Sequence, residues 1–219
     1  MDIQIGRGKT ARRAYGIDEI ALAPGMRTLD PSLADTSWKI GGIEREVPII
    51  ASAMDGVVDV KIAVLLSQLG ALGVLNLEGI QTRYVDPEPI LDRIASVGPT
   101  EFVTLMQELY AEPIKPALID QWIAQIKSQR GIAAVSATPA GAVQYGDAVA
   151  KAGADLFFVQ ATVVSTTHLS PESIVPLNLA QFCREMPMPV VLGNCVTYEV
   201  TMELMKAGAA AVVVGLQWY

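Results

Sequence analysis

Lys151-Ala-Gly-Ala-Asp-Leu-Phe-Phe-Val-Gln160 connects the end of one predicted helix to a buried strand, and Lys206-Ala-Gly-Ala-Ala-Ala-Val-Val-Val214 repeats the arrangement. In each stretch a glycine, Gly153 or Gly208, can adopt the left-handed conformation that commonly ends a helix. The apolar run that follows is typical of a strand buried on both faces, as in parallel sheets. Both stretches therefore predict helix-to-strand units of a parallel α/β fold.

The alternation of helices and strands extends on either side of these stretches. Strands are predicted over 47–54, 71–76, 132–138, 156–160, 189–192 and 211–214. Helices are predicted over 62–70, 142–152, 171–185 and 198–207, whereas the first 45 residues have an irregular pattern. We expect a single domain over 1–219, built on a parallel sheet.

Six such strands are compatible with two architectures. One is an open doubly wound sheet. The other is about six of the eight units of a (β/α)8 TIM barrel, a fold of roughly 250 residues. No Gly-x-Gly-x-x-Gly follows the first strand, which disfavours a dinucleotide-binding Rossmann domain. The predicted fold class is α/β of the TIM-barrel type, incomplete at its C-terminal end.

Residues 77–130 form a longer excursion between two predicted strands. Pro87 can begin a helix, 100–111 suggests a second one, and Pro116 suits the first turn of a third. Apolar residues spaced for one face of this third helix are Ile119, Trp122, Ile123 and Ile126. The excursion is therefore predicted to be helical.

Composition and charge exclude several classes of function. Hydrophobic residues make up 51% of the 219 residues and charged residues 18%, so a sizeable core is available. No apolar run reaches the roughly 18 residues that a membrane span needs, and the N-terminus lacks a secretory signal, so we expect a cytoplasmic protein without a membrane partner. A net charge of −7 argues against nucleic acid as a partner. Two cysteines offer neither a disulfide framework nor a metal site.

The first polar motif is Ala51-Ser-Ala-Met-Asp55, at the carboxyl end of a predicted strand. Ser52 offers a hydroxyl group, Asp55 a carboxylate, and Met54 a flexible apolar surface that could lie under a flat ring. The alternative is a tight turn in which Asp55 caps the following helix. The spacing alone leaves both interpretations open.

The second and third motifs follow the next predicted strands. Gln160-Ala-Thr-Val-Val-Ser-Thr-Thr-His168 gathers amide, hydroxyl and imidazole groups, although a solvated loop position is the expectation for His168. Leu192-Gly-Asn-Cys-Val-Thr197 supplies Asn194, whose amide can donate and accept hydrogen bonds, and Thr197, which can cap the next helix. No neighbouring cation marks Cys195 as a nucleophile, so we expect a small buried side chain there. Cys183, inside an amphipathic helix, is expected to pack.

The order and spacing of these motifs resemble the IMP dehydrogenase/GMP reductase family. Ala51-Ser-Ala-Met-Asp-Gly-Val-Val-Asp59 is similar to its Ser-Pro-Met-Asp-x-Val-Thr-Glu element, with Ala53 in place of the proline. The other stretches that carry the resemblance are Tyr15–Pro24, Gly70–Leu75, Ala152–Val159, Val191–Thr197 and Ala207–Gly215.

Two features resemble the IMP dehydrogenase-related subgroup of actinobacteria and cyanobacteria in particular. The excursion over 77–130 is too short for the paired regulatory CBS modules that many family members insert. Gln160-Ala-Thr-Val-Val-Ser165 also replaces the family's Asp-Ser-Ser/Ala-His-Gly element.

The resemblance implies a hydride transfer between purine C2 and a nicotinamide, through a cysteine-linked intermediate. It implies a purine nucleotide (IMP, GMP or XMP) as ligand, NAD or NADP(H) as cofactor, a monovalent cation, and a homo-oligomer, which in the family is a tetramer or an octamer. It places Ser52, Met54 and Asn194 at the substrate. The cofactor residues are then Gln160, Ala161 and Thr162, together with Asn194.

Two departures from the family pattern limit these expectations. Gln160 stands where the family has an aspartate, so a hydrogen bond there would lack charge assistance. Gly215 is followed by Leu216-Gln-Trp-Tyr219, whereas the family continues with Gly-x-Gly-Pro-Gly-x-x-Cys. The expectation is a chain truncated after the sixth strand, without a catalytic residue or the cation loop, and inactive alone. The alternative is a non-catalytic nucleotide-binding or assembly module.

Overall fold

The computed structural model describes residues 2–13, 15–23, 25–166 and 176–215, and it divides the chain into two compact units, 1–35 and 36–219. The first unit contains an antiparallel hairpin of two strands, β1 (Asp2–Gly6) and β2 (Lys9–Arg12). Two short 3-10 helices follow, η1 (Ile17–Glu19) and η2 (Pro31–Leu33). The sheet that positions the candidate site lies entirely in the second unit.

The prediction of an irregular first 45 residues was wrong. Besides β1 and β2, a second hairpin pairs β3 (Trp38–Ile40) with β4 (Ile43–Arg45). Its turn is Gly41-Gly42, and both glycines have positive φ, 53° and 93°. A Gly-Gly pair between short apolar segments is a recognised hairpin signal, because a two-residue turn that matches the twist of the strands requires left-handed backbone.

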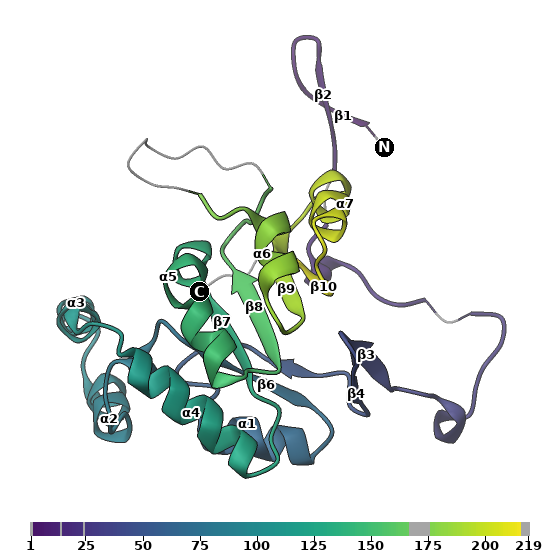
Figure 1. The fold of residues 1–219 in the computed structure, drawn as a ribbon. Coiled ribbons are helices and arrows are strands. Elements are labelled where there is room, and N and C mark those ends of the chain that lie inside the picture. Colours follow the sequence, from purple (N-terminus) through teal and green to yellow (C-terminus); the bar gives the residue numbers. More distant parts are fainter. Residues whose placement is uncertain (1, 14, 24, 167–175, 216–219) are drawn as a thin grey trace. The chain divides into compact units, whose positions relative to one another are not determined.

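The second unit is built on a six-stranded sheet in the order β10-β9-β8-β7-β6-β5, with every neighbouring pair parallel. The strands are β5 (Ile50–Ala51), β6 (Leu72–Asn76), β7 (Ala134–Ala137), β8 (Leu156–Gln160), β9 (Val190–Cys195) and β10 (Ala211–Val214). Spatial order follows chain order without reversal, as Figure 1 shows. A doubly wound sheet reverses its order at a switch point, so the alternative architecture is excluded and the TIM-barrel type is confirmed.

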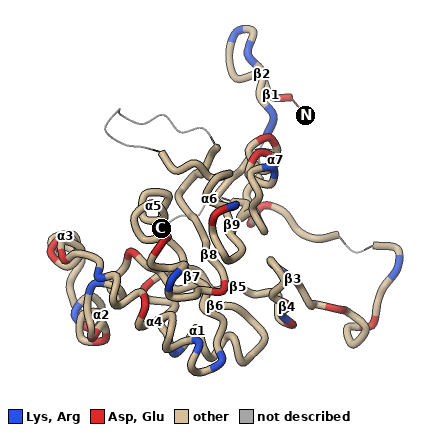
Figure 2. The backbone as a smooth tube through the Cα atoms, viewed as in Figure 1, with Lys and Arg blue, Asp and Glu red and all other residues tan. Residues whose placement is uncertain are grey.

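Helices cover one face of this sheet and leave the other as the barrel interior. The covering helices are α1 (Val60–Gln68), α4 (Pro116–Ser128), α5 (Pro139–Ala152), α6 (Leu179–Glu185) and α7 (Tyr198–Lys206). Their buried residues form one core with Val135, Phe157 and Leu192 from the strands. The alternate strand residues Leu156 and Phe158 belong to a second core on the other face. Burial on both faces explains why β7 and β8 are mostly apolar and carry no charge, as the uniformly tan tube of β8 in Figure 2 illustrates.

The β3–β4 hairpin closes the amino-terminal end of the sheet. Ile40 packs in the interior core with Leu72 and Leu156, which stand at the beginnings of their strands. Gly41 lies so close to Pro189, just before β9, that a Cβ atom at this glycine would be 2.2 Å from the proline Cγ. The hairpin thus packs at the amino-terminal end of the sheet, opposite the polar groups at the carboxyl ends.

Several element bounds differ from the predictions, each for a local reason. The strand predicted over 47–54 contains only the two paired residues of β5. Helix α5 begins at Pro139 rather than Ala142, because Thr138 accepts a hydrogen bond from the Gly141 backbone and caps the helix. Helix α6 begins at Leu179, capped by Asn178, whereas 171–175 of the predicted helix lie outside the described residues. The left-handed glycines Gly153 and Gly208 are confirmed.

The excursion over 77–130 is helical, as predicted. It contains η3 (Ile80–Thr82), α2 (Glu88–Ser96), α3 (Phe102–Ala111) and then α4. Ile80, Leu105 and Leu109 form a small core of their own between these elements. Trp122 of α4 donates a hydrogen bond from its indole nitrogen to the Gln81 carbonyl (2.6 Å), which ties the excursion to the helix layer. In the described ranges no helix is both long and apolar enough to cross a membrane.

The largest side chain with no exposed surface gives a test of this packing. Phe157 is 0% exposed and meets Phe182 edge-on at 5.6 Å between ring centroids. We expect Phe157→Ala to lower the free energy of unfolding by about 3–5 kcal/mol, because it leaves a cavity between the sheet and α6. Urea unfolding followed by tryptophan fluorescence measures this value. The matched control is Phe102→Ala at a 41% exposed position, which should cost much less, and equal losses would contradict the assignment of the core.

Candidate functional site

Polar side chains meet at the carboxyl edge of three neighbouring strands. Asn76 ends β6 and is in register with Ser136 of β7. The Ser136 hydroxyl donates a hydrogen bond to Oε1 of Gln160, the last residue of β8, at 3.1 Å. Because the amide oxygen of Gln160 is engaged in this way, its Nε2 donor is directed away from Ser136. The three side chains therefore form a row across the sheet edge.

These three residues line a small cavity of about 250 Å³. Its other lining residues are Ala53, Glu78, Tyr110, Ala137 and Thr138. Most of the lining side chains carry hydrogen-bonding groups, so the space suits a polar ligand group. Glu78 itself is occupied, because it accepts hydrogen bonds from the Thr138 backbone nitrogen and from the Thr138 hydroxyl (3.0 Å) at the beginning of α5.

A larger cavity, of about 750 Å³, lies beside the first and shares Ala53, Asn76 and Tyr110 with it. Met54, which is 40% exposed, lines this second cavity, whereas Gln160 lines the first. Two predicted site residues thus face neighbouring spaces rather than a single one.

The interpretation of Asp55 as a helix cap was wrong. Helix α1 is capped by Asp59, whose carboxylate accepts from the Ile62 backbone nitrogen at 2.7 Å. Asp55 instead accepts hydrogen bonds from the Ile80 backbone nitrogen (2.7 Å) and the Tyr110 hydroxyl (3.0 Å). The carboxylate therefore joins the loop after β5 to the excursion.

Tyr110 is held from both sides. Its hydroxyl group contacts Asp55, and the Arg83 guanidinium lies over its ring at 5.1 Å from the centroid. Arg83 also donates to the backbone carbonyls of Tyr110 and Glu78, both at 3.1 Å. Burial and the adjacent Asp55 carboxylate raise the pKa of Tyr110 above its usual value, so the hydroxyl stays a donor at neutral pH.

Asn194 lies at a break in the pairing of the last two strands. Val213 is in register with Gly193 and Val214 with Cys195, so Asn194 is the extra residue of a bulge. Its backbone nitrogen donates to the Ala161 carbonyl at 3.0 Å, beside the end of β8. The side chain is 2% exposed, yet its Oδ1 has no hydrogen-bond partner among the described residues.

The remaining predicted residues are placed less decisively. Ser52 and Ala161 are half-buried at the ends of β5 and β8, and Thr162 is exposed. Thr197 caps α7 as predicted, since it accepts from the Val200 backbone nitrogen at 3.3 Å. His168 lies outside the described residues.

Both cysteines are structural in this fold. Cys195 is fully buried in the core between sheet and helices, with its sulfur 3.1 Å from the Thr201 hydroxyl, so the expectation of a small buried side chain is confirmed. Cys183 packs against the same core from α6, and burial raises its pKa. Within the described ranges no group of three or more His, Cys, Asp or Glu side chains could hold a metal ion.

Three contributors to the edge escaped the sequence analysis: Asn76, Ser136 and Tyr110. The first two were read as parts of apolar strands, although a single polar residue at a strand's carboxyl end is a usable signal in a parallel fold. Tyr110 had no such signal, because it reaches the sheet from a helix of the excursion, 34 residues further along the chain than Asn76.

A parallel barrel-type sheet with polar groups gathered at its carboxyl edge is the architecture of many enzymes. Residues 14–217 match the family model described as the IMP dehydrogenase / GMP reductase domain. The chain belongs to the IMP dehydrogenase/GMP reductase family.

Individual relatives agree with this assignment. Uncharacterised oxidoreductases of Mycobacterium tuberculosis and Mycobacterium bovis are each 35% identical over 218 residues, covering 97% of this chain and 58% of theirs. An inosine-5'-monophosphate dehydrogenase of Methanocaldococcus jannaschii is 35% identical over 66 residues, 30% of this chain and 13% of its own length. A crystal structure of an IMP dehydrogenase/GMP reductase-like protein from Corynebacterium glutamicum superposes with a TM-score of 0.90 at 28% identity, covering 98% of this chain and 57% of the other. The chain thus spans somewhat more than half the length of the relatives that match it from end to end.

The contact between Gly79 and Asp55 provides a test of the site's framework. A Cβ atom at Gly79 would lie 1.9 Å from Asp55 Oδ1, so Gly79→Ala must displace the carboxylate. We expect the free energy of unfolding to fall by about 1–3 kcal/mol. The control is Gly98→Ala, where no atom lies within 4 Å of the added carbon. Chemical unfolding of both variants measures the difference, and a tolerated Gly79→Ala would contradict the described loop packing.

Proposed function

We propose that these residues form the nucleotide- and cofactor-facing part of a purine-nucleotide oxidoreductase. The reaction is hydride transfer between purine C2 and a nicotinamide, through a cysteine-linked intermediate. The substrate class is a purine nucleotide (IMP, GMP or XMP), placed against Ser52, Met54 and Asn194. Family membership supports the reaction class, and the polar edge of the sheet supports the location.

The observation that carries the proposal is the unpartnered oxygen of Asn194. A buried acceptor without a donor costs free energy, so such groups in native proteins usually have a partner that is yet to be placed. The Asn194 backbone is hydrogen-bonded to Ala161, the residue after Gln160. A ligand whose donor group reaches this corner would satisfy the oxygen. The amide N–H of a purine base or the carboxamide of a nicotinamide has that chemistry.

The residues present can offer a nicotinamide cofactor neutral hydrogen bonds, but no charged group at position 160. Gln160, with its oxygen held by Ser136, would offer Nε2 to a ribose or amide oxygen, and Ala161 and Thr162 would border the same group. When bound, the cofactor accepts or supplies the hydride. The chain's own contribution is to orient it through neutral hydrogen bonds, without a carboxylate at position 160. These residues do not discriminate between NAD and NADP(H).

The nucleophilic cysteine of the proposed reaction is assigned to sequence outside these 219 residues. Cys195 points into the core between sheet and helices, and Cys183 lies on α6. The same proposal places the monovalent-cation loop outside these residues. We further propose that 1–219 is one barrel domain, that 77–130 stands in place of the CBS modules, and that the protein assembles as a homo-oligomer.

A second candidate function is a non-catalytic nucleotide-binding or assembly module. The observation that favours it is the structural position of both cysteines, because a bound nucleotide would meet no thiolate contributed by these residues. The two candidates differ in turnover, not in ligand binding.

An assay and a titration together test the function. We expect the 219-residue chain to bind at least one of IMP, GMP and XMP in calorimetry without turning over IMP with NAD or GMP with NADPH. A version extended beyond Tyr219 by the sequence that follows in the gene is expected to turn over one of the two pairs. Any activity should survive Cys195→Ala. Turnover by the 219-residue chain that Cys195→Ala abolishes would contradict the proposal, and an extended protein without turnover would favour the second candidate.

Asn194 provides the residue-level prediction. Asn194→Ala is expected to weaken nucleotide or cofactor binding about two- to tenfold, the loss of one ordinary hydrogen bond. The control is Asn178→Ala, which removes the cap of α6, should cost about 1 kcal/mol of stability, and should leave affinity unchanged. Calorimetry measures the affinities and thermal unfolding the stabilities. Equal affinities for the wild type and Asn194→Ala would remove this residue from the site.

A further inference from the structure

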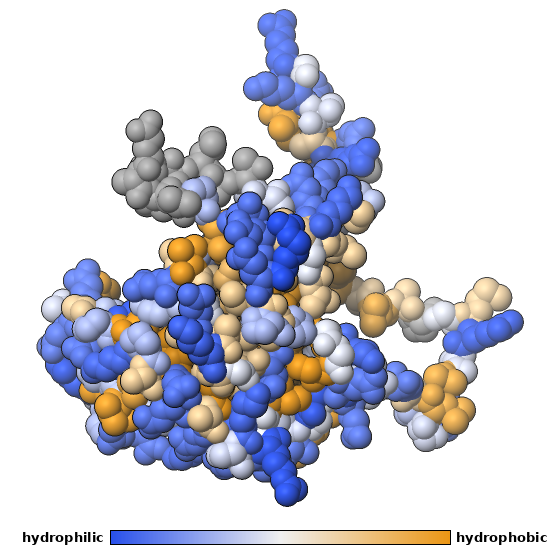
Figure 3. Space-filling model, in the orientation of Figure 1, coloured by the Kyte–Doolittle hydropathy of each residue, from blue (hydrophilic) through white to orange (hydrophobic). Residues whose placement is uncertain are grey.

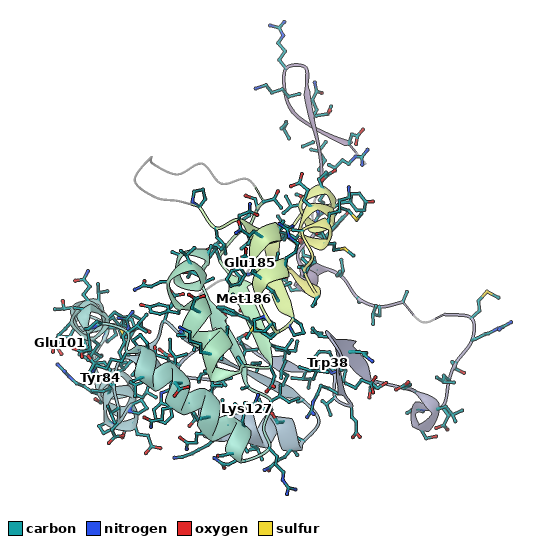
Figure 4. All side chains as sticks on the ribbon, in the orientation of Figure 1. Trp38, Tyr84, Glu101, Lys127, Glu185 and Met186 are labelled. Carbon is teal, nitrogen blue, oxygen red and sulfur yellow. The ribbon has the colours of Figure 1, made fainter. Side chains whose placement is uncertain are left out.

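The larger cavity is built jointly by the barrel and the excursion. The loop between β5 and α1 contributes Met54 and Val57, α1 contributes Ile62, and helices α2 and α3 contribute Leu91, Phe102 and Met106. Its volume of about 750 Å³ is within the range of small-molecule sites. Figure 3 shows hydrophobic residues exposed among hydrophilic ones over this helical region, whose side chains appear as sticks around Tyr84 and Glu101 in Figure 4. The cavity is therefore a mainly apolar space that the excursion creates.

The charge on this cavity is of one sign. Asp55, Asp59 and Asp92 are among its lining residues, and no Lys, Arg or His is. The neighbouring Lys61 is exposed and already paired with Glu88. Among the lining residues a phosphate or carboxylate would meet only like charge, whereas a cation would be attracted. The nearby Arg83 guanidinium lies over the Tyr110 ring and does not line the cavity. The lining therefore disfavours the phosphate end of a nucleotide in the larger cavity.

Tyr110 separates this cavity from the polar one. It lines both cavities, its hydroxyl group is bound by Asp55, and its ring is covered by Arg83 at 5.1 Å. Contacts on both sides fix the ring in place, so the two cavities stay distinct. Tyr110, Phe102 and the Met54 thioether also offer the surfaces that cationic and aromatic groups favour.

We propose that the larger cavity is a second binding compartment, which takes a planar aromatic group carrying a positive charge, and that Tyr110 is the wall that sets its size. The volume and apolar lining accept the ring, and the three carboxylates accept the charge. This compartment adjoins the proposed nucleotide site, because Met54 lines it, but Gln160, Ser136 and Asn194 do not. Its occupant contacts the Met54 loop and α3 together, and so bridges the barrel and the excursion.

Three isosteric probes of different charge test the compartment: benzamidine (+1), benzamide (0) and benzoate (−1). We expect the intact 219-residue chain to bind benzamidine at least about fivefold more tightly than benzamide, as for a partly exposed ion pair, and benzoate most weakly. Ligand-observed NMR titration measures these weak affinities. Benzoate binding as tightly as benzamidine, or no binding of benzamidine, would overturn the proposal.

Variants locate the binding. Ala95→Phe fills the cavity from α2 and is expected to abolish benzamidine binding with little change in thermal unfolding, because Ala95 is exposed. Asp92→Asn should reduce the preference for benzamidine over benzamide about two- to fivefold, whereas Asp120→Asn, an exposed carboxylate on α4 outside the cavity, should not. Unchanged benzamidine affinity in Ala95→Phe would overturn the assignment.

The wall is tested by ligand size. Tyr110→Ala is expected to admit larger cationic aromatics, such as a naphthamidine, at least about fivefold better than the wild type. Tyr110→Phe, which keeps the ring but not the hydrogen bond to Asp55, should not show this gain. The control is Tyr84→Phe. The Tyr84 hydroxyl donates a hydrogen bond to the Leu109 carbonyl, and Tyr84 lines neither cavity. If Tyr110→Ala folds and shows no gain, Tyr110 is not the wall. Because nucleotide titrations are separate, failure here leaves the proposed function untouched.

Discussion

The parallel pairing of six consecutive strands is the constraint on which the rest of this protein depends. The connection from each strand to the next crosses the same face of the sheet. The helices therefore gather on that face, and the other face forms the barrel interior. The same winding brings every carboxyl end to one edge. Asn76, Ser136 and Gln160 meet there although they are far apart in the sequence, and the β3–β4 hairpin fills the opposite end.

Helix α3 of the excursion is linked to this scaffold by a few polar contacts, whereas α4 packs in the main core. Asp55 receives hydrogen bonds from Ile80 and Tyr110, and Arg83 links Tyr110 to Glu78. The buried residues of α3, Leu105 and Leu109, belong to a small satellite core, so the polar links hold α3 to the loop after β5. The consequence is functional, because α3 supplies a wall to the space at the sheet edge. Part of the excursion thereby lines the candidate site.

Local sequence signals predicted most elements because they depend on neighbouring residues. The glycines that end α5 and α7, the exact bounds of β8 and β10, and Thr197 as the cap of α7 all follow from nearest-neighbour chemistry. Two further expectations differ from the structure, although each of these places has a local signal of its own. The Gly41-Gly42 turn forms a hairpin within the segment predicted to be irregular, and α6 begins after its cap at Asn178, whereas the predicted helix begins at 171.

The sequence by itself determined the strand and helix alternation, the family resemblance and the kinds of polar residue that follow each strand. It left open whether Asp55 belongs to a site or caps the following helix, because the spacing permits both. Tertiary structure made that choice, since only Asp55 lies within reach of Ile80 and Tyr110. It also decided that Met54 and Gln160 face different cavities, and that Tyr110 stands between them. Such outcomes depend on contacts between distant segments, which spacing along the chain does not encode.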